Sequence, residues 1–241
     1  MPAFAGQVAV VTGASSGIGR AVAVALAERG AAVCLVGRDP GRLESAVQAA
    51  ESSAGRALAV RAELTSDDAV RSLAKRVDDE FGRLDVLVHA AAMIELDALA
   101  EASLDDLDRH YRVNLRAPYV LTQALLPALR AAEGDVVFVN STAGVAAGAN
   151  SSGYAASKHG LKAVADSLRA EVNADRVRVL TLLLGRTATP MQAGVHGAEG
   201  RDYRPDRLIQ PEDVAQLLTG LLALPRTAEV TEVAMRPLMK P

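Results

Sequence analysis

The 241-residue sequence has few aromatic side chains: it contains 4 Tyr, 3 Phe and no Trp, which is 3% of the chain. Positive charge is not in excess either, because 26 basic and 29 acidic side chains give a formal net charge of −3. Proteins that bind nucleic acid neutralise phosphates with Lys and Arg, and single strands also stack on aromatic rings. The composition therefore argues against a nucleic-acid partner.

Cysteine and long apolar segments are also scarce. The single cysteine, Cys34, cannot form an intrachain disulfide, and its apolar neighbours predict a buried thiol. No apolar run reaches the ~18–20 residues that cross a bilayer, and the N-terminal segment lacks the basic start of a signal peptide. We expect a soluble, cytoplasmic protein without a membrane partner, and we predict no metal site.

Aliphatic residues take the place of the missing aromatics, and they occur in strand-like segments that alternate with helix-like ones. Runs such as VAVV and VVFV are apolar without alternation, which is typical of strands buried on both faces. We predict one domain over residues 1–241 of the α/β class, a Rossmann-type doubly wound parallel sheet of about seven strands with helices on both faces. Strands are expected at 7–11, 32–37, 57–62, 84–90, 135–140, 176–184 and 229–235. Helices are expected at 17–29, 41–52, 65–82, 103–132, 152–173 and 211–224.

Two segments depart from this regular pattern. Pro118 and Pro127 lie inside the long helical region 103–132, so we expect kinks or breaks and more than one helix there. Residues 185–208 are rich in Gly, Pro and charged side chains and have no clear periodicity. We expect that segment to be irregular.

A glycine-rich turn, TGASSGIG at residues 12–19, joins the first predicted strand to the first helix. A tight turn needs a residue that tolerates positive φ, and a pyrophosphate needs backbone without a Cβ beside it. The N–H groups that open the following helix attract phosphate. We therefore predict a dinucleotide site, although a purely structural turn would have similar glycines. The predicted contacts are Gly13, Ser15, Ser16, Gly17, Ile18 and Gly19.

The residues after the second predicted strand indicate which dinucleotide binds. An acid there would accept from the ribose 2′-hydroxyl, but this sequence has Gly37 followed by Arg38. A guanidinium suits a 2′-phosphate, so NADP(H) is favoured over NAD(H). Two alternatives stay open: Arg38 is an ordinary solvated side chain, or Asp39 neutralises it.

Tyr154 and Lys158 are four residues apart in a predicted helix and therefore share one face. A nearby ammonium stabilises a phenolate and lowers the tyrosine pKa. Ser141 lies at the carboxyl end of the fifth predicted strand, the edge where open α/β sheets bind ligands. Each residue alone would pass for a surface side chain, but together, downstream of the glycine turn, they predict a catalytic group.

With Asn114 in VNL, Ser141 in NSTAG and the YAASK segment at 154–158, the sequence resembles the short-chain dehydrogenase/reductase family over nearly its whole length. The resemblance implies an oxidoreductase that interconverts a small ketone or aldehyde and its alcohol. It also implies roles: Tyr154 as general acid/base, Lys158 lowering its pKa and binding the nicotinamide ribose, Ser141 bonding the substrate oxygen, and Asn114 holding a water in the proton relay.

The sequence departs from the family after the fourth predicted strand, where the usual Asn-Asn-Ala-Gly is His89-Ala90-Ala91-Ala92. We interpret His89 as a buried, hydrogen-bonded histidine rather than a catalytic one. Ala92 would crowd the cofactor side of the turn. The further cofactor contacts that the resemblance implies are Glu63, Leu64, His89, Ala90, Ala91, Gly185, Thr187 and Thr189.

The resemblance also implies a substrate lid near residues 187–208 and a homotetramer or homodimer formed by the helices around 103–132 and 154–173. Those helices would alternatively only cover the sheet. A catalytically weak NADP-binding regulatory or scaffold protein is the main functional alternative. An epimerase or dehydratase holding NAD tightly is a third, but its usual longer substrate domain does not fit into 241 residues.

Overall fold

The computed structural model describes residues 3–51 and 56–239. Its centre is a seven-stranded sheet of order β3-β2-β1-β4-β5-β6-β7, in which every neighbouring pair is parallel. The predicted Rossmann-type α/β fold is confirmed. The strands are β1 Val8–Thr12, β2 Ala32–Gly37, β3 Ala57–Arg61, β4 Val86–His89, β5 Asp135–Ser141, β6 Arg178–Leu184 and β7 Glu232–Met235.

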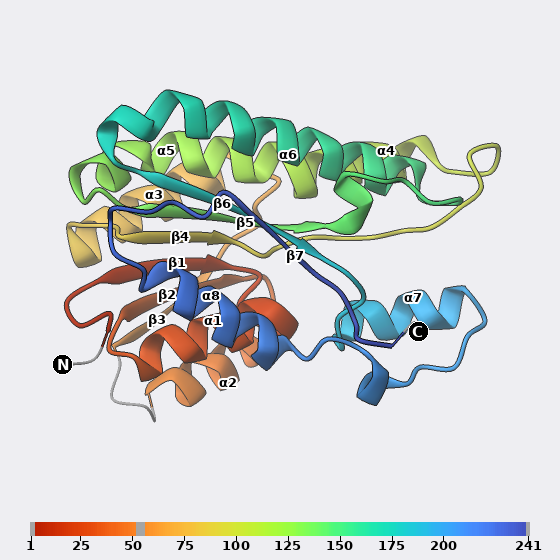
Figure 1. Cartoon of the computed structure of the whole chain (residues 1–241), viewed down its shortest axis with the longest axis horizontal. Coiled ribbons are helices and arrows are strands. Elements are labelled where there is room, and N and C mark those ends of the chain that lie inside the picture. The colour runs from red at the N-terminus through yellow and green to blue at the C-terminus, as the bar shows by residue number, and fades with distance from the viewer. Residues whose placement is uncertain (1–2, 52–55, 240–241) are drawn as a thin grey trace.

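Helices cover both faces of this sheet (Figure 1). One face carries α1 Gly17–Glu28, α2 Pro40–Glu51 and α8 Pro211–Leu222; the other carries α3 Asp67–Phe81, α4 Leu104–His110, α5 Ala117–Ala131 and α6 Ser152–Val172. Two hydrophobic cores lie on opposite faces of the sheet. Along β1, Ala9 and Val11 pack into one core, and Val8 and Val10 pack into the other. This strand is therefore apolar without alternation because each face of the sheet has its own core.

The region between residues 103 and 132 is divided, but not by its prolines. A π-helix, Tyr111–Arg116, separates α4 from α5. Pro118 lies in the first turn of α5, where its missing N–H costs little, and Pro127 lies inside α5 without ending it. The prediction of more than one segment is correct, and the assignment of the break to proline is wrong.

Residues 185–208 are more ordered than predicted. They contain α7, Pro190–Ala198, and a short 3-10 turn, Pro205–Arg207. Thr189 caps α7 by accepting a hydrogen bond from the Gln192 N–H at 3.1 Å. The helix went unnoticed because its nine residues include two glycines and no repeated apolar spacing. In the described part of the chain, no helix combines the length and apolar content needed to cross a membrane.

Candidate active site

The glycine turn between β1 and α1 is held against the end of β4. Gly13 has φ +65°, and a Cβ on it would lie 2.8 Å from the Ala91 N atom. A Cβ on Gly19 would lie 2.4 Å from the Gly13 carbonyl oxygen. The predicted needs for positive φ and for close packing are thus both met. The free N–H groups at the start of α1 face the carboxyl edge of the sheet, where an anion is favoured.

Thr12, the last residue of β1, fixes the same turn to β4, and sequence reasoning missed it. Its hydroxyl accepts from the Ala90 N–H at 3.1 Å and the Ala91 N–H at 3.2 Å, and donates to the Val88 carbonyl at 3.3 Å. Thr12 is buried. A buried polar side chain at the end of an apolar run was the signal available in the sequence, because such a group needs partners.

A cavity of about 880 Å³ begins at this turn and extends along the carboxyl ends of the strands. Its volume lies in the range of small-molecule and cofactor sites. Most of the predicted site residues line it, and they come from the carboxyl ends of six strands and from two helices. These are Gly13, Ser15, Ser16, Gly17, Ile18, Gly19, Arg38, Glu63, Leu64, Ala90, Ala91, Ser141, Tyr154, Lys158, Gly185, Thr187 and Thr189.

Ser141, Tyr154 and Lys158 lie close together in the lining of this cavity. Lys158 lies one helical turn after Tyr154 in α6; its Nζ donates to the Val139 carbonyl at 3.0 Å and lies 5.9 Å from the centre of the tyrosine ring. The Ser141 Oγ accepts from the Ala143 N–H at 3.1 Å, which fixes the hydroxyl at the end of β5. The structure therefore brings the three predicted catalytic side chains together.

Asn140 links α6 to β5 through its side chain. It directly precedes Ser141 and was not among the predicted site residues. Its Nδ2 donates to the Lys158 carbonyl at 3.1 Å, and its Oδ1 accepts from the Ser141 N–H at 2.8 Å. Gly144 allows this contact, because a Cβ there would lie 2.8 Å from the Asn140 Oδ1. One buried amide thus sets the position of two predicted catalytic residues, Ser141 and Lys158.

Burial dominates the ionisation of Tyr154 and Lys158, the predicted catalytic pair. It lowers the pKa of Lys158 from 10.5 to about 8, because the ammonium is 2% exposed. Burial also raises the pKa of Tyr154, and a hydrogen bond with Ser141 only partly offsets this rise. The expected lowering of the tyrosine pKa by Lys158 is not found in this geometry, in which the ammonium bonds to a backbone carbonyl instead.

Two predicted site residues lie outside the cavity. His89 is 2% exposed, its Nε2 lies 2.8 Å from the Thr122 Oγ1, and its ring stacks on Phe138 with centroids 5.0 Å apart. Burial lowers the pKa of His89 to about 3, so the ring is neutral. His89 is therefore a buried structural histidine, as interpreted; its ring points into the core, and its implied contact with a cofactor stays a prediction.

Asn114 is also buried outside the cavity lining, inside the π-helix. Its Oδ1 accepts from the Met93 N–H at 2.9 Å, and its Nδ2 donates to the Met93 carbonyl and the Ser157 Oγ, both at 3.0 Å. The side chain therefore ties the segment after β4 to α6. Its implied role in a proton relay stays a prediction.

Arg38, which lines the cavity after β2, is not neutralised by its neighbour. Asp39 pairs with Arg42 at 3.3 Å, whereas the Arg38 Nη1 lies 3.9 Å from the Glu63 Oε2. Arg38 and Glu63 are both more than half exposed, so this contact is weak. Arg42 lines the cavity as well and was missed, because it lies in the first turn of α2 rather than directly after β2.

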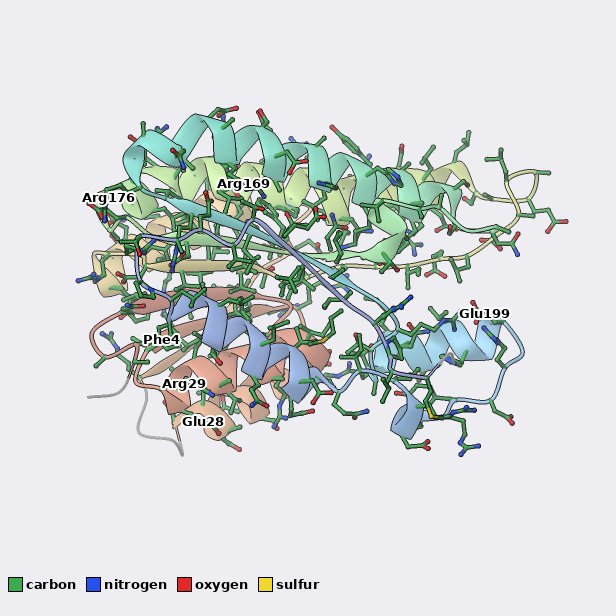
Figure 2. All side chains as sticks on the ribbon, viewed as in Figure 1. Phe4, Glu28, Arg29, Arg169, Arg176 and Glu199 are labelled. Atoms are coloured by element: carbon green, nitrogen blue, oxygen red, sulfur yellow. The ribbon has the colours of Figure 1, made fainter. Side chains whose placement is uncertain are left out.

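Residues of α7 line another part of the cavity. Met191, Gln192 and Val195 line it, and Glu199, which follows the helix and is labelled in Figure 2, lies at the same wall. The Glu199 carboxylate accepts two hydrogen bonds from Arg186, at 2.6 and 2.7 Å. This ion pair joins the residue just before the predicted lid segment 187–208 to a residue in its middle.

Comparison with known proteins gives matches over almost the whole chain. The family model for short chain dehydrogenases matches residues 7–200. A cis-4-hydroxycyclohexanecarboxylate dehydrogenase of Sinomonas cyclohexanicum is 37% identical over 229 residues, which are 91% of this chain and 90% of the relative.

Solved structures with the same fold match equally completely. A metagenomic short-chain oxidoreductase in complex with NADP has a TM-score of 0.86 and 33% identity, covering 99% of this chain and 100% of its own. An alcohol dehydrogenase from the archaeon Thermococcus sibiricus, complexed with 5-hydroxy-NADP, has a TM-score of 0.89 and 27% identity, covering 98% of both chains.

Proposed function

The chain belongs to the short-chain dehydrogenase family, and we propose that it is an NADP(H)-dependent oxidoreductase that interconverts a small ketone or aldehyde and the corresponding alcohol. One observation carries this proposal. The phosphate-attracting glycine turn and the Ser141, Tyr154 and Lys158 side chains line the same cavity of about 880 Å³.

The residues of this cavity fit a dinucleotide. Gly13 and Gly19 leave no room for a Cβ, and the start of α1 offers N–H groups to a pyrophosphate. Arg38 and Arg42 line the far end, where two guanidinium groups favour a 2′-phosphate. Two related structures hold NADP or a derivative of it, which agrees with this choice. A bound nicotinamide nucleotide would supply or accept the hydride.

Side chains of the protein carry out the proton transfer. Because burial raises the pKa of Tyr154, the phenol is protonated at neutral pH and is ready to donate to a carbonyl oxygen. Ser141 shares that oxygen as a hydrogen-bond donor, and Lys158 keeps positive charge near the ring. The reverse reaction needs the phenolate, so alcohol oxidation should speed up as the pH rises.

The pocket wall indicates the substrate class. Ile94, Leu96, Met191 and Val195 are aliphatic, and together with α7 they enclose the cavity beyond Tyr154. Such a wall suits a small, mostly apolar carbonyl compound, in keeping with a relative named for its action on a hydroxycyclohexanecarboxylate. We assign the segment 187–208 as the lid over this substrate.

The test is the variant Tyr154→Phe, which removes the proton donor and keeps the ring. With NADPH and a panel of small ketones, kcat should fall by at least 10²-fold while the NADPH dissociation constant stays within about twofold. Tyr119→Phe, an exposed position on α5, is the matched control. Equal turnover by Tyr154→Phe would refute the mechanism, and tight NADPH binding without turnover by the wild type would favour a regulatory protein.

We also propose a homodimer or homotetramer in the cytoplasm. Leu104, Leu107 and Tyr111 are exposed along α4 and the π-helix, where a second copy would cover them. Sedimentation of the wild type and of Leu104→Glu tests the assembly, because a monomer in both would exclude it.

Burial raises the pKa of the Cys34 thiol to about 12, so the cysteine is unreactive.

A further inference from the structure

His110, the last residue of α4, has no part in the chemistry above but lies directly behind it. The side chain is 2% exposed and is followed at once by the π-helix that holds Asn114. Burying an imidazole costs free energy unless its nitrogens find partners, so its contacts call for an explanation.

The imidazole contacts two segments that contribute residues to the cavity lining. Its Nε2 accepts a hydrogen bond from the Glu95 N–H at 3.0 Å, and its ring lies T-shaped to Tyr154 with centroids 6.1 Å apart and planes at 66°. Glu95 is flanked by Ile94 and Leu96, both of which line the cavity. One side chain thus joins the substrate-facing segment after β4 to the phenol that donates the proton.

The contacts also define the tautomer. Because Nε2 accepts from an N–H, it carries no proton, and a neutral ring then has its proton on Nδ1. That Nδ1 is buried and has no hydrogen-bond partner among the residues that the structure describes. Gly153 leaves the space for it, since a Cβ there would lie 3.1 Å from Nδ1. The ring is therefore confined between Glu95 and α6.

We propose that neutral His110 is a positioning residue, which holds the Glu95 segment and the Tyr154 ring in a fixed relation so that a substrate carbonyl meets the phenol. The inference rests on the proposed function. Small errors in the position of a reacting group lower kcat steeply, while nucleotide binding elsewhere in the cavity is untouched.

The arrangement makes the positioning sensitive to acid. A proton added at Nε2 would face the Glu95 N–H, so two donors would meet and the hydrogen bond would be lost. The charged groups around the ring are Glu95 from the segment after β4, and Asp106 and Arg109 from α4; the titratable Tyr154 faces it from α6. Burial lowers the pKa of His110, and the Asp106 and Glu95 carboxylates oppose this change.

Two variants separate the contacts. His110→Phe keeps an aromatic ring beside Tyr154 and removes the acceptor, and it should lower kcat about 10-fold, or ~1.4 kcal/mol in activation free energy. His110→Gln offers an amide oxygen to Glu95 without a titratable ring. It should keep kcat within about threefold of wild type. The decrease in kcat/KM at acid pH that protonation of His110 causes should be absent from this variant.

The controls distinguish positioning from simple support of the fold. The NADPH dissociation constant should stay within about twofold in both variants, because His110 does not line the main cavity. His159→Gln changes an exposed histidine of α6 and should leave the pH profile unchanged. A wild type that turns over, with a His110→Phe variant equal to it at every pH, overturns the inference and leaves the proposed function standing.

A measurement on the wild type does not depend on the folding of any variant. The chain has four histidines, and long-range ¹H–¹⁵N spectra report which ring nitrogen of each is protonated. His110 should show the Nδ1–H tautomer, with unprotonated Nε2, at pH 7. The Nε2–H tautomer there would overturn the inference even if no substrate had been found.

Discussion

The buried lysine should make the protein less stable at neutral pH than at alkaline pH, and Lys158→Met should remove that difference. Burial lowers the pKa of Lys158 from 10.5 to about 8, so between these values the unfolded chain binds more protons than the folded one. Stability then rises with pH. The penalty on the free energy of unfolding is about 3 kcal/mol at pH 7 and about 1.4 kcal/mol at pH 9.5.

The comparison between the two pH values isolates this effect. Lys158→Met also deletes the hydrogen bond to the Val139 carbonyl, which is worth about 1 kcal/mol, but that loss is the same at both pH values and cancels. Urea unfolding at pH 7 and 9.5 should therefore show the advantage of the variant shrinking by about 2 kcal/mol as the pH rises.

The control is Lys75→Met, which removes an exposed ammonium. The Asp79 carboxylate raises the pKa of Lys75, so that side chain stays charged at both pH values and its variant should show no such change. An unchanged difference between wild type and Lys158→Met would mean that the folded protein holds its lysine with an ordinary pKa, and the account of burial would be wrong.

Three further changes test other parts of the site. Arg38→Asp removes a guanidinium and adds a repelling charge, so it should weaken NADPH binding at least about 10-fold while NADH binding stays within about twofold; fluorescence titration measures both, and equal weakening would contradict the assigned 2′-phosphate site. Glu199→Gln weakens the bond to Arg186 and should raise the KM for the carbonyl substrate about threefold, while the free energy of unfolding changes by less than about 1 kcal/mol. An unaltered KM would mean that this ion pair does not affect the lid. His89→Ala empties a site between Thr122 and Phe138 and should lower the free energy of unfolding by about 3 kcal/mol in urea titrations; a loss below about 1 kcal/mol would mean that the ring is poorly packed.

The features that the sequence predicts correctly are those fixed by short-range sterics. The apolar run of β1 reports a strand with a core on each side, and the Gly13 and Gly19 positions report a turn without room for a Cβ. Tyr154 and Lys158 share a face because helical spacing alone decides it. These properties depend on few neighbours and are therefore readable without a structure.

The features that could not be predicted depend on contacts with segments that are distant in the sequence. The direction of the Tyr154 pKa shift depends on burial beneath other segments and on where the Lys158 ammonium finds an acceptor. His89 turns away from the cavity because Thr122 and Phe138, 33 and 49 residues later in the sequence, receive its ring. The π-helix has no sequence signature that separates it from the α-helices on either side.

An all-parallel sheet that begins and ends the chain with strands also decides where a fusion partner can be attached. β1 starts at the amino edge of the sheet, whereas β7 ends at the carboxyl edge, so the described chain enters and leaves the sheet on opposite sides (Figure 1). After β7, Arg236 and Pro237 pass so close to Gly185 that a Cβ there would lie 3.0 Å from the Pro237 side chain. A fusion partner joined shortly after β7 would therefore start beside the cavity, which Gly185 lines, and one joined shortly before β1 would start away from it.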